Sequence, residues 1–233
     1  MAIRNDLLGG TDWTTNEKPL KAVDLNDTFD AAATIVKQNP GFWLSSTLYD
    51  VYDDFDSETP GAFTTNTDWT ISASGVGTAT IVTSNNANGG STGNELKLGG
   101  DSGSGSNAYT ATATSINIVS NRHTHVRLAG YYDQSTSSAS YRTIQASFDG
   151  GTTYYSILNN RGERGSGCWA YSDFTVVAKG SDEYDLYGGG RLLASAVTIA
   201  SPQLSVRMTA GAAYNGEGYL YVDDVVQNKV DVV

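Results

Sequence analysis

The stretch Arg142-Thr143-Ile144-Gln145-Ala146-Ser147-Phe148-Asp149-Gly150-Gly151-Thr152-Thr153-Tyr154 predicts a β-hairpin. Ile144, Ala146 and Phe148 alternate with polar residues, which is the period of a strand that buries one face. The side chains of Ser147 and Asp149 can accept hydrogen bonds from turn amides, and Gly151 tolerates a positive φ. We therefore expect two antiparallel strands joined by a tight turn.

The same alternation continues in both directions, between Leu48 and Asn228. Runs rich in Gly, Asn and Ser separate the apolar segments and have the composition of turns. Many short strands at this spacing favour a mainly β fold, a two-sheet antiparallel sandwich of jelly-roll type. The expected strands are Trp69–Ser74, Thr78–Thr83, Glu95–Leu98, Tyr109–Val119, His125–Tyr132, Arg142–Phe148, Thr153–Leu158, Trp169–Val177, Leu192–Ile199, Leu204–Thr209 and Gly218–Val226.

The N-terminal part of the chain has a different pattern, so we divide the chain into residues 1–47 and 48–233. The first twenty residues have no regular period and predict an extended arm, whereas Asp24–Gln38 predicts one short α-helix. This helix carries an apolar stripe that would suit oligomerisation, although packing of a single helix on its own sandwich is an equal alternative. The stripe consists of Leu25, Phe29, Ala32 and Val36.

Composition and charge exclude several classes of partner. The chain has 25 acidic and 14 basic residues and a net charge of −11, which argues against binding to a phosphate backbone. A single cysteine, Cys168, excludes an intramolecular disulfide framework. Arg4 and Asp6 interrupt any apolar signal segment, and no run approaches the ~18 apolar residues of a membrane span. We expect synthesis in the cytoplasm without a signal peptide, no membrane insertion and no nucleic-acid partner.

Two acidic clusters lie near the beginning and the end of the segment expected to form the sandwich. Asp54 and Asp56 form the first cluster, and Asp223 and Asp224 form the second. Terminal strands that lie side by side would bring these carboxylates together, and hard oxygen ligands of this kind suit calcium. Asp54-Phe55-Asp56 and the segment Tyr219–Val225 resemble the opening and closing strands of jelly-roll carbohydrate-binding modules. That resemblance implies a structural calcium ion, whereas the residues alone fit solvated strand ends equally well.

Tyrosines near strand ends and in loops are the expected ligand-binding residues. Tyrosine presents a large contact area with a polar tip, which suits stacking on sugar rings. A subunit interface built from the same side chains is an equal alternative. The selected residues are Tyr131, Tyr132, Tyr184 and Tyr187.

The N-terminal motif indicates where the chain acts. Asp12-Trp13 and the segment Glu17–Phe29 resemble the opening of many structural proteins of tailed phages and viruses, although Asn16-Glu17 departs from that pattern. The resemblance implies a virion protein of the tail-fibre, head-fibre or capsid-decoration kind. It implies attachment to other virion proteins through the N-terminal arm, a homo-oligomer that we take to be a trimer, and a displayed sandwich that contacts host-surface glycans.

We predict no enzymatic activity and assign no catalytic residue. Ser147–Tyr154 resembles a single Asp-box of sialidases, but those enzymes carry several boxes and an arginine triad. No P-loop and no H-E-x-x-H motif occurs. The alternatives to a virion structural protein are a free carbohydrate-binding β-sandwich module and a glycan hydrolase with a carboxylate pair that the sequence does not reveal.

The trimer prediction has a direct test in the helical stripe. Replacing Phe29 by aspartate places a charge on the predicted contact face, so we expect the variant to dissociate into monomers. Light scattering at micromolar concentration measures the mass of both proteins. A monomeric wild-type protein would contradict the prediction.

Overall fold

The computed structural model describes residues 49–83, 87, 93–101, 108–132, 141–161, 168–211, 217–229 and 231–232. The predicted arm and helix, the stripe formed by Leu25, Phe29, Ala32 and Val36, and the boundary between residues 47 and 48 all lie outside the described residues. No helix among the described residues is long and apolar enough to cross a membrane.

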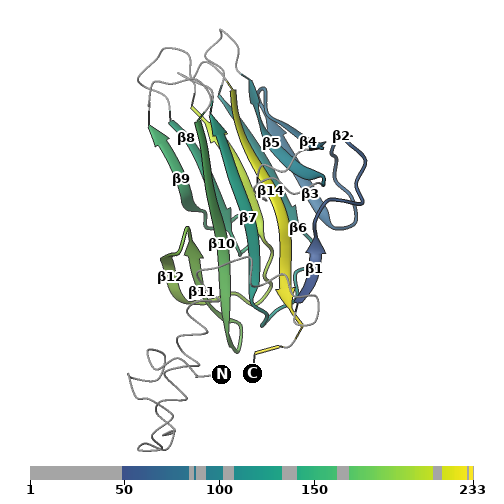
Figure 1. Ribbon diagram of the computed structural model, residues 1–233. Helices are drawn as coiled ribbons and strands as arrows, with labels where there is room; N and C mark the ends of the chain where they lie inside the picture. Colours follow the sequence, from purple (N-terminus) through teal and green to yellow (C-terminus); the bar gives the residue numbers. More distant parts are fainter. Residues whose placement is uncertain are drawn as a thin grey trace, which may run out of the picture. The chain divides into compact units, whose positions relative to one another are not determined.

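The described chain forms two antiparallel sheets packed face to face, which confirms the predicted jelly-roll-type sandwich (Figure 1). The nine-stranded sheet has the order β12 (Arg191–Thr198), β11 (Glu183–Gly188), β10 (Cys168–Gly180), β7 (Thr124–Tyr132), β14 (Glu217–Asn228), β5 (Glu95–Asp101), β4 (Thr78–Val82), β2 (Gly61–Ala62), with β1 (Tyr49–Asp53) paired to β14. The five-stranded sheet has the order β3 (Trp69–Ser74), β6 (Tyr109–Ser115), β13 (Ser205–Ala210), β8 (Tyr141–Ser147), β9 (Tyr155–Arg161).

The core lies between the two sheets and is built by alternation along each strand. The nine-stranded sheet contributes Leu128, Phe174 and Leu220, and the five-stranded sheet contributes Ile144 and Met208; each of these side chains is at most 1% exposed. Burying side chains of this size contributes about 1.5–3 kcal/mol each, before the entropy cost of ordering them. The other side of each strand is left for polar residues or for a ligand.

The turn between β8 and β9 forms as predicted from residues 147–154. The Ser147 hydroxyl donates to Asp149 Oδ1 at 2.6 Å, and the Gly151 amide donates to Ser147 Oγ at 3.0 Å. The Thr153 amide donates to Asp149 Oδ1 at 2.9 Å, and Gly151 has a φ of 91°. These side chains satisfy the turn amides and fix where the second strand begins.

The structure corrects the expected position of Tyr184. This residue lies in β11, a strand absent from our prediction, and its side chain is fully buried against Phe148 with ring centroids 5.2 Å apart. The Asn121 amide donates to the Tyr184 hydroxyl at 2.9 Å. Glu183 and Asp185 alternate with Tyr184 and Leu186 and gave this segment the composition of a loop, so the expected place of Tyr184 at an exposed strand end or loop was wrong.

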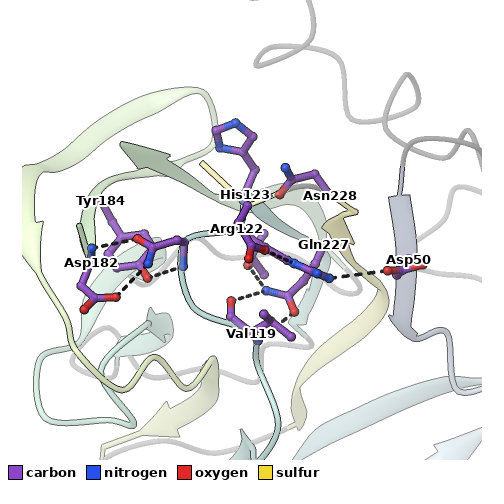
Figure 2. A network of polar contacts seen from close by, with 11 residues as sticks. Asp50, Val119, Arg122, His123, Asp182, Tyr184, Gln227 and Asn228 are labelled. Atoms are coloured by element: carbon purple, nitrogen blue, oxygen red, sulfur yellow. Dashed lines mark hydrogen bonds and ion pairs between the residues drawn. The ribbon is translucent and has the colours of Figure 1, made fainter. Parts of the chain in front are cut away.

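Residues 119–123 connect three parts of the sheet at the start of β7 (Figure 2). Val119 exchanges two hydrogen bonds with the Gln227 side chain, at 3.0 and 3.1 Å. Arg122 lies 3.6 Å from Asp50 of β1, and the Asn121 side chain donates to Asp182 at 3.1 Å. This polar network therefore ties β1, β14 and the β10–β11 turn together at one end of the sheet.

Candidate ligand-binding face

The outward side of the nine-stranded sheet carries a group of aromatic side chains at the opposite end of β7. In the register of β14, β7 and β10, Tyr219 lies beside Tyr131, which lies beside Trp169. One pleat further along, Tyr221 and Tyr171 flank Ala129 in the same way. Because side chains alternate between the faces of a sheet, all of these rings point away from the core. We call Tyr131, Trp169, Tyr171, Tyr219 and Tyr221 the aromatic face.

The rings of the aromatic face form one connected group. The Trp169 ring centroid lies 4.9 Å from that of Tyr131, 5.3 Å from that of Tyr221 and 6.4 Å from that of Tyr171. Tyr219 continues the group, with its centroid 6.3 Å from that of Tyr131 and 6.4 Å from that of Tyr221. Contacts at these distances hold each ring in place before any ligand binds.

Two members of the aromatic face are exposed to solvent. Tyr171 is 62% exposed and Trp169 is 39% exposed, whereas Tyr221 is 7% exposed beneath its neighbours. Adjacent exposed aromatic side chains on rigid strands are a common mark of a binding surface. The structure therefore places a packed and partly exposed aromatic surface on β7, β10 and β14.

Lys97 of β5 borders the aromatic face. Its Nζ lies 3.4 Å from the centroid of the Tyr219 ring, which is the arrangement of a cation–π contact. Burial lowers the pKa of Lys97, and the charge of Glu217 opposes that change. Burial, followed by the charges of Glu217 and Asp101, raises the pKa of Tyr219 to about 12. Tyr219 is therefore a neutral phenol at physiological pH.

The predicted tyrosines are only partly brought together. Tyr131 belongs to the aromatic face, whereas Tyr184 is in the core and Tyr187 is half-buried in β11, opposite Thr175 of β10. Tyr132 ends β7, but its side chain lies outside the described ones. Our prediction missed Trp169, Tyr171, Tyr219 and Tyr221, although aromatic residues at alternate positions of two strands would have indicated them.

The structure brings the predicted acidic clusters close to each other. β1 pairs with β14, with Asp53 opposite Val225, as expected for adjacent terminal strands. Burial, followed by the charge of Asp224, raises the pKa of Asp223 to about 8, and Glu95 and Asp56 add to this effect. Burial also raises the pKa of Asp224, to which Asp54 and Asp56 contribute while Arg127 opposes.

These carboxylates already have partners within the chain. Asp224 Oδ2 lies 3.0 Å from Arg127, Asp56 Oδ1 accepts the Asn94 amide at 2.7 Å, and Asp223 Oδ1 accepts the Asp224 amide at 2.8 Å. Among the residues that the structure describes, no group of three or more His, Cys, Asp or Glu side chains has an arrangement that could hold a metal ion. Calcium at Asp54, Asp56, Asp223 and Asp224 therefore stays a prediction from the sequence.

Chelation tests the calcium prediction. An ion bound only by the native state adds stability that depends on its concentration, so EDTA should lower the melting temperature by several degrees and added calcium should restore it. Asp54→Asn should make the protein insensitive to both additions. Identical melting temperatures with EDTA and with calcium would contradict the prediction.

His125 lies on the same side of the sheet, beyond the acidic residues. It is 1% exposed, and its Nδ1 lies 2.8 Å from the Thr175 hydroxyl, which donates to Asp173 Oδ2 at 2.8 Å. Burial, with a further contribution from the charge of Arg127, lowers the pKa of His125 to about 3. The native protein therefore holds this imidazole in its neutral form.

This lowered pKa predicts a loss of stability in acid. The unfolded histidine takes up a proton below pH ~6.5, whereas the native one does so only near pH 3, so stability falls between these values. Linkage gives a loss of about 2 kcal/mol between pH 8 and pH 5, or a melting temperature about 4–8 °C lower. His125→Gln should reduce this pH dependence in thermal melts. An unchanged slope in the variant would contradict the assignment.

Comparison with known proteins gives structural matches alone. No family model matches the chain, and no curated protein matches it in sequence. TmCBM61, solved in complex with beta-1,4-galactotriose, aligns at 10% identity over 76% of this chain and 97% of its own, with a TM-score of 0.38. The family 11 carbohydrate-binding module from Clostridium thermocellum aligns at 14% identity over 77% of this chain and 95% of its own, with a TM-score of 0.31.

A phage protein is also among the similar structures. The enzymatically active domain of tailspike protein 4 from bacteriophage CBA120 aligns at 14% identity over 76% of this chain but 21% of its own, with a TM-score of 0.34. With scores and identities this low, the matches carry no information about the ligand of this chain. The functional argument therefore depends on the aromatic face itself.

Proposed function

We propose that this protein is a glycan-binding β-sandwich and that the aromatic face is its contact site. The observation that carries this proposal is the group of five aromatic side chains projecting from three adjacent strands on the side away from the core. Flat rings can stack on the apolar faces of sugar rings, and tyrosine hydroxyls can exchange hydrogen bonds with sugar hydroxyls.

The composition of the surroundings favours a sugar over an apolar protein surface. Asp101 and Glu217 flank the aromatic face at one end, and Asp173 and Arg127 flank it at the other. Carboxylate oxygens are strong acceptors for hydroxyl groups, which sugars supply in number. Aromatic rings surrounded by such acceptors match a polyhydroxylated ligand.

We infer binding without bond cleavage. Glu95 and Asp223, the carboxylate residues beside Lys97 and Tyr221, are 0% and 4% exposed. A general acid or a nucleophile must reach within hydrogen-bond distance of the glycosidic oxygen or the anomeric carbon, which burial of this extent prevents for these two residues. Asp101 and Glu217 at the border of the aromatic face are accessible to solvent, so they are the carboxylates whose activity must be tested. An assay for new reducing ends tests whether the protein cleaves glycans. Release of reducing ends from a polysaccharide that the protein binds would identify a hydrolase.

We also propose that the glycan-binding domain is displayed on a virus particle. The N-terminal segment of residues 12–29, which lies outside the described residues, supports this through its resemblance to virion structural proteins. Several weak sites on one particle would give strong attachment through multivalency. Mass spectrometry and immunogold microscopy of purified particles test this location. A protein found free in the medium and absent from particles would instead be a free carbohydrate-binding module.

Affinity electrophoresis tests the binding function itself. Native gels containing soluble galactan, xylan, mixed-linkage glucan, arabinan or hydroxyethyl cellulose should retard the protein on at least one polymer relative to a gel without polysaccharide. Isothermal titration with oligosaccharides of the retaining polymer then measures the affinity. If no polymer in the panel retards the protein, the glycan-binding proposal fails.

A further inference from the structure

We propose that the aromatic face accepts uncharged glycans and rejects anionic ones such as uronates and sulfated sugars. This inference rests on the proposed glycan-binding function and specifies its ligand class. It follows from the arrangement of charges around the five rings, which is a property of the assembled sheet.

Carboxyl side chains lie at both ends of the aromatic face along the strand direction, and Arg127 lies among those at one end. Glu217 lies opposite Asp101 in the pairing of β14 with β5, two residues before Tyr219. On the other side of the rings, Asp223 lies opposite Arg127, which lies opposite Asp173. Strand alternation places all of these side chains on the same side of the sheet as the rings. A sugar stacked on the aromatic face would therefore lie between the Asp101–Glu217 pair and the carboxylate of Asp173, while Asp223, whose pKa burial raises to about 8, is largely protonated at neutral pH and adds little charge.

Two described cationic side chains next to the aromatic face, Lys97 and Arg127, already have partners. Lys97 Nζ lies 3.4 Å from the centroid of the Tyr219 ring, and Arg127 lies 3.0 Å from Asp224 Oδ2. An incoming carboxylate or sulfate would have to displace these contacts before it gained a partner. Lys97 also covers one side of the Tyr219 ring, which leaves Trp169 and Tyr171 as the most exposed stacking surfaces.

The carboxylates also act on the ionisation of the rings. Burial raises the pKa of Tyr219 and Tyr221, and the charges of Glu217 and Asp101 add to this effect at Tyr219, as does the charge of Glu95 at Tyr221. The same negative potential that disfavours a phenolate disfavours any anionic group at that place. Hydroxyl groups of a neutral sugar, in contrast, can donate to these carboxylates.

Matched pairs of polymers test this inference by affinity electrophoresis at low ionic strength, where charge effects are least screened. Hydroxyethyl cellulose and cellulose sulfate compare a neutral and an anionic polymer with the same backbone, galactan and polygalacturonate give a second comparison in which the linkage also differs, and chitosan supplies a cationic polymer. We expect retardation by a neutral polymer and none by its anionic counterpart. The double variant Asp101→Asn/Glu217→Gln keeps the amide oxygens as acceptors and should gain at least about tenfold in affinity for the anionic polymer.

The matched control is Asp68→Asn/Glu58→Gln, which changes the net charge equally at residues outside the aromatic face and its border. Equal retardation by neutral and anionic polymers would overturn the inference while leaving glycan binding intact. The inference also fails if the control variant gains as much affinity for the anionic polymer as the Asp101/Glu217 variant does. It fails likewise if chitosan is the one polymer that retards the protein. Absence of retardation by every polymer would overturn the proposed function and this inference together.

Discussion

Replacing Trp169 by alanine should weaken glycan binding by about 30- to 150-fold, and replacing Tyr171 in addition should abolish retardation in affinity gels. Trp169 contacts Tyr131, Tyr171 and Tyr221, so its removal takes away a contact surface and also loosens the three rings around it. Central aromatic residues of binding sites typically contribute about 2–3 kcal/mol, which corresponds to this range of affinity.

The fold should tolerate both changes. Trp169 and Tyr171 are 39% and 62% exposed and lie outside the core between the sheets, so we expect the free energy of unfolding to change by less than about 1 kcal/mol. Titration calorimetry measures affinity, and urea denaturation measures stability. A binding loss that accompanied a collapse of stability would say nothing about contact with sugar.

Tyr187→Ala is the matched control for this prediction. Tyr187 pairs with Thr175, which is six residues along β10 from Trp169, or about 20 Å. The Tyr187→Ala variant should bind glycan as the wild type does. If Tyr187→Ala lost binding while Trp169→Ala kept it, the ligand site would lie at the β11 end of the sheet, and the aromatic face would not be the contact surface.

Replacing Trp69 by alanine should cost about 3–5 kcal/mol of stability, the largest effect that we expect from a single substitution. Trp69 begins β3 in the five-stranded sheet, is fully buried, and packs on Phe55 and Tyr52 with ring centroids 5.6 and 5.7 Å away. Its indole N–H donates to Asp53 Oδ2 at 2.6 Å. Since Asp53 ends β1 of the other sheet, this side chain joins the two layers.

Trp69→Phe separates the contribution of packing from that of the hydrogen bond to Asp53. Phenylalanine fills most of the volume but cannot donate to Asp53, whose carboxylate is already desolvated: burial raises its pKa, and the hydrogen bonds from the Phe55 amide and Trp69 oppose that rise. We expect a loss of about 1–3 kcal/mol for this variant. Urea denaturation measures the free energy of unfolding of both variants. Stabilities equal to the wild type would show that the sandwich does not depend on this connection.

The sequence by itself determined most of the strands and their local geometry, but not β1, β2 or β11. Alternating residues such as Ile144, Ala146 and Phe148 predicted which face would be buried, because side chains on a strand point to opposite sides by covalent geometry. Ser147, Asp149 and Gly151 predicted the β8–β9 turn, because their side-chain and backbone preferences act over a few residues. The sequence predicted proximity of the acidic clusters only on the condition that the terminal strands pair, and the structure supplies that pairing between β1 and β14.

Only the tertiary structure decided which strands lie side by side. Tyr131, Trp169 and Tyr219 belong to strands far apart in the chain, and the pairing of β7 with β10 and of β7 with β14 makes them neighbours. Strand order depends on long-range hydrogen bonds and on the joint packing of both sheets, which no local pattern specifies. For the same reason Tyr184, in a segment with the composition of a loop, proved to be buried in β11, and the aromatic face lies on the outward side of a sheet.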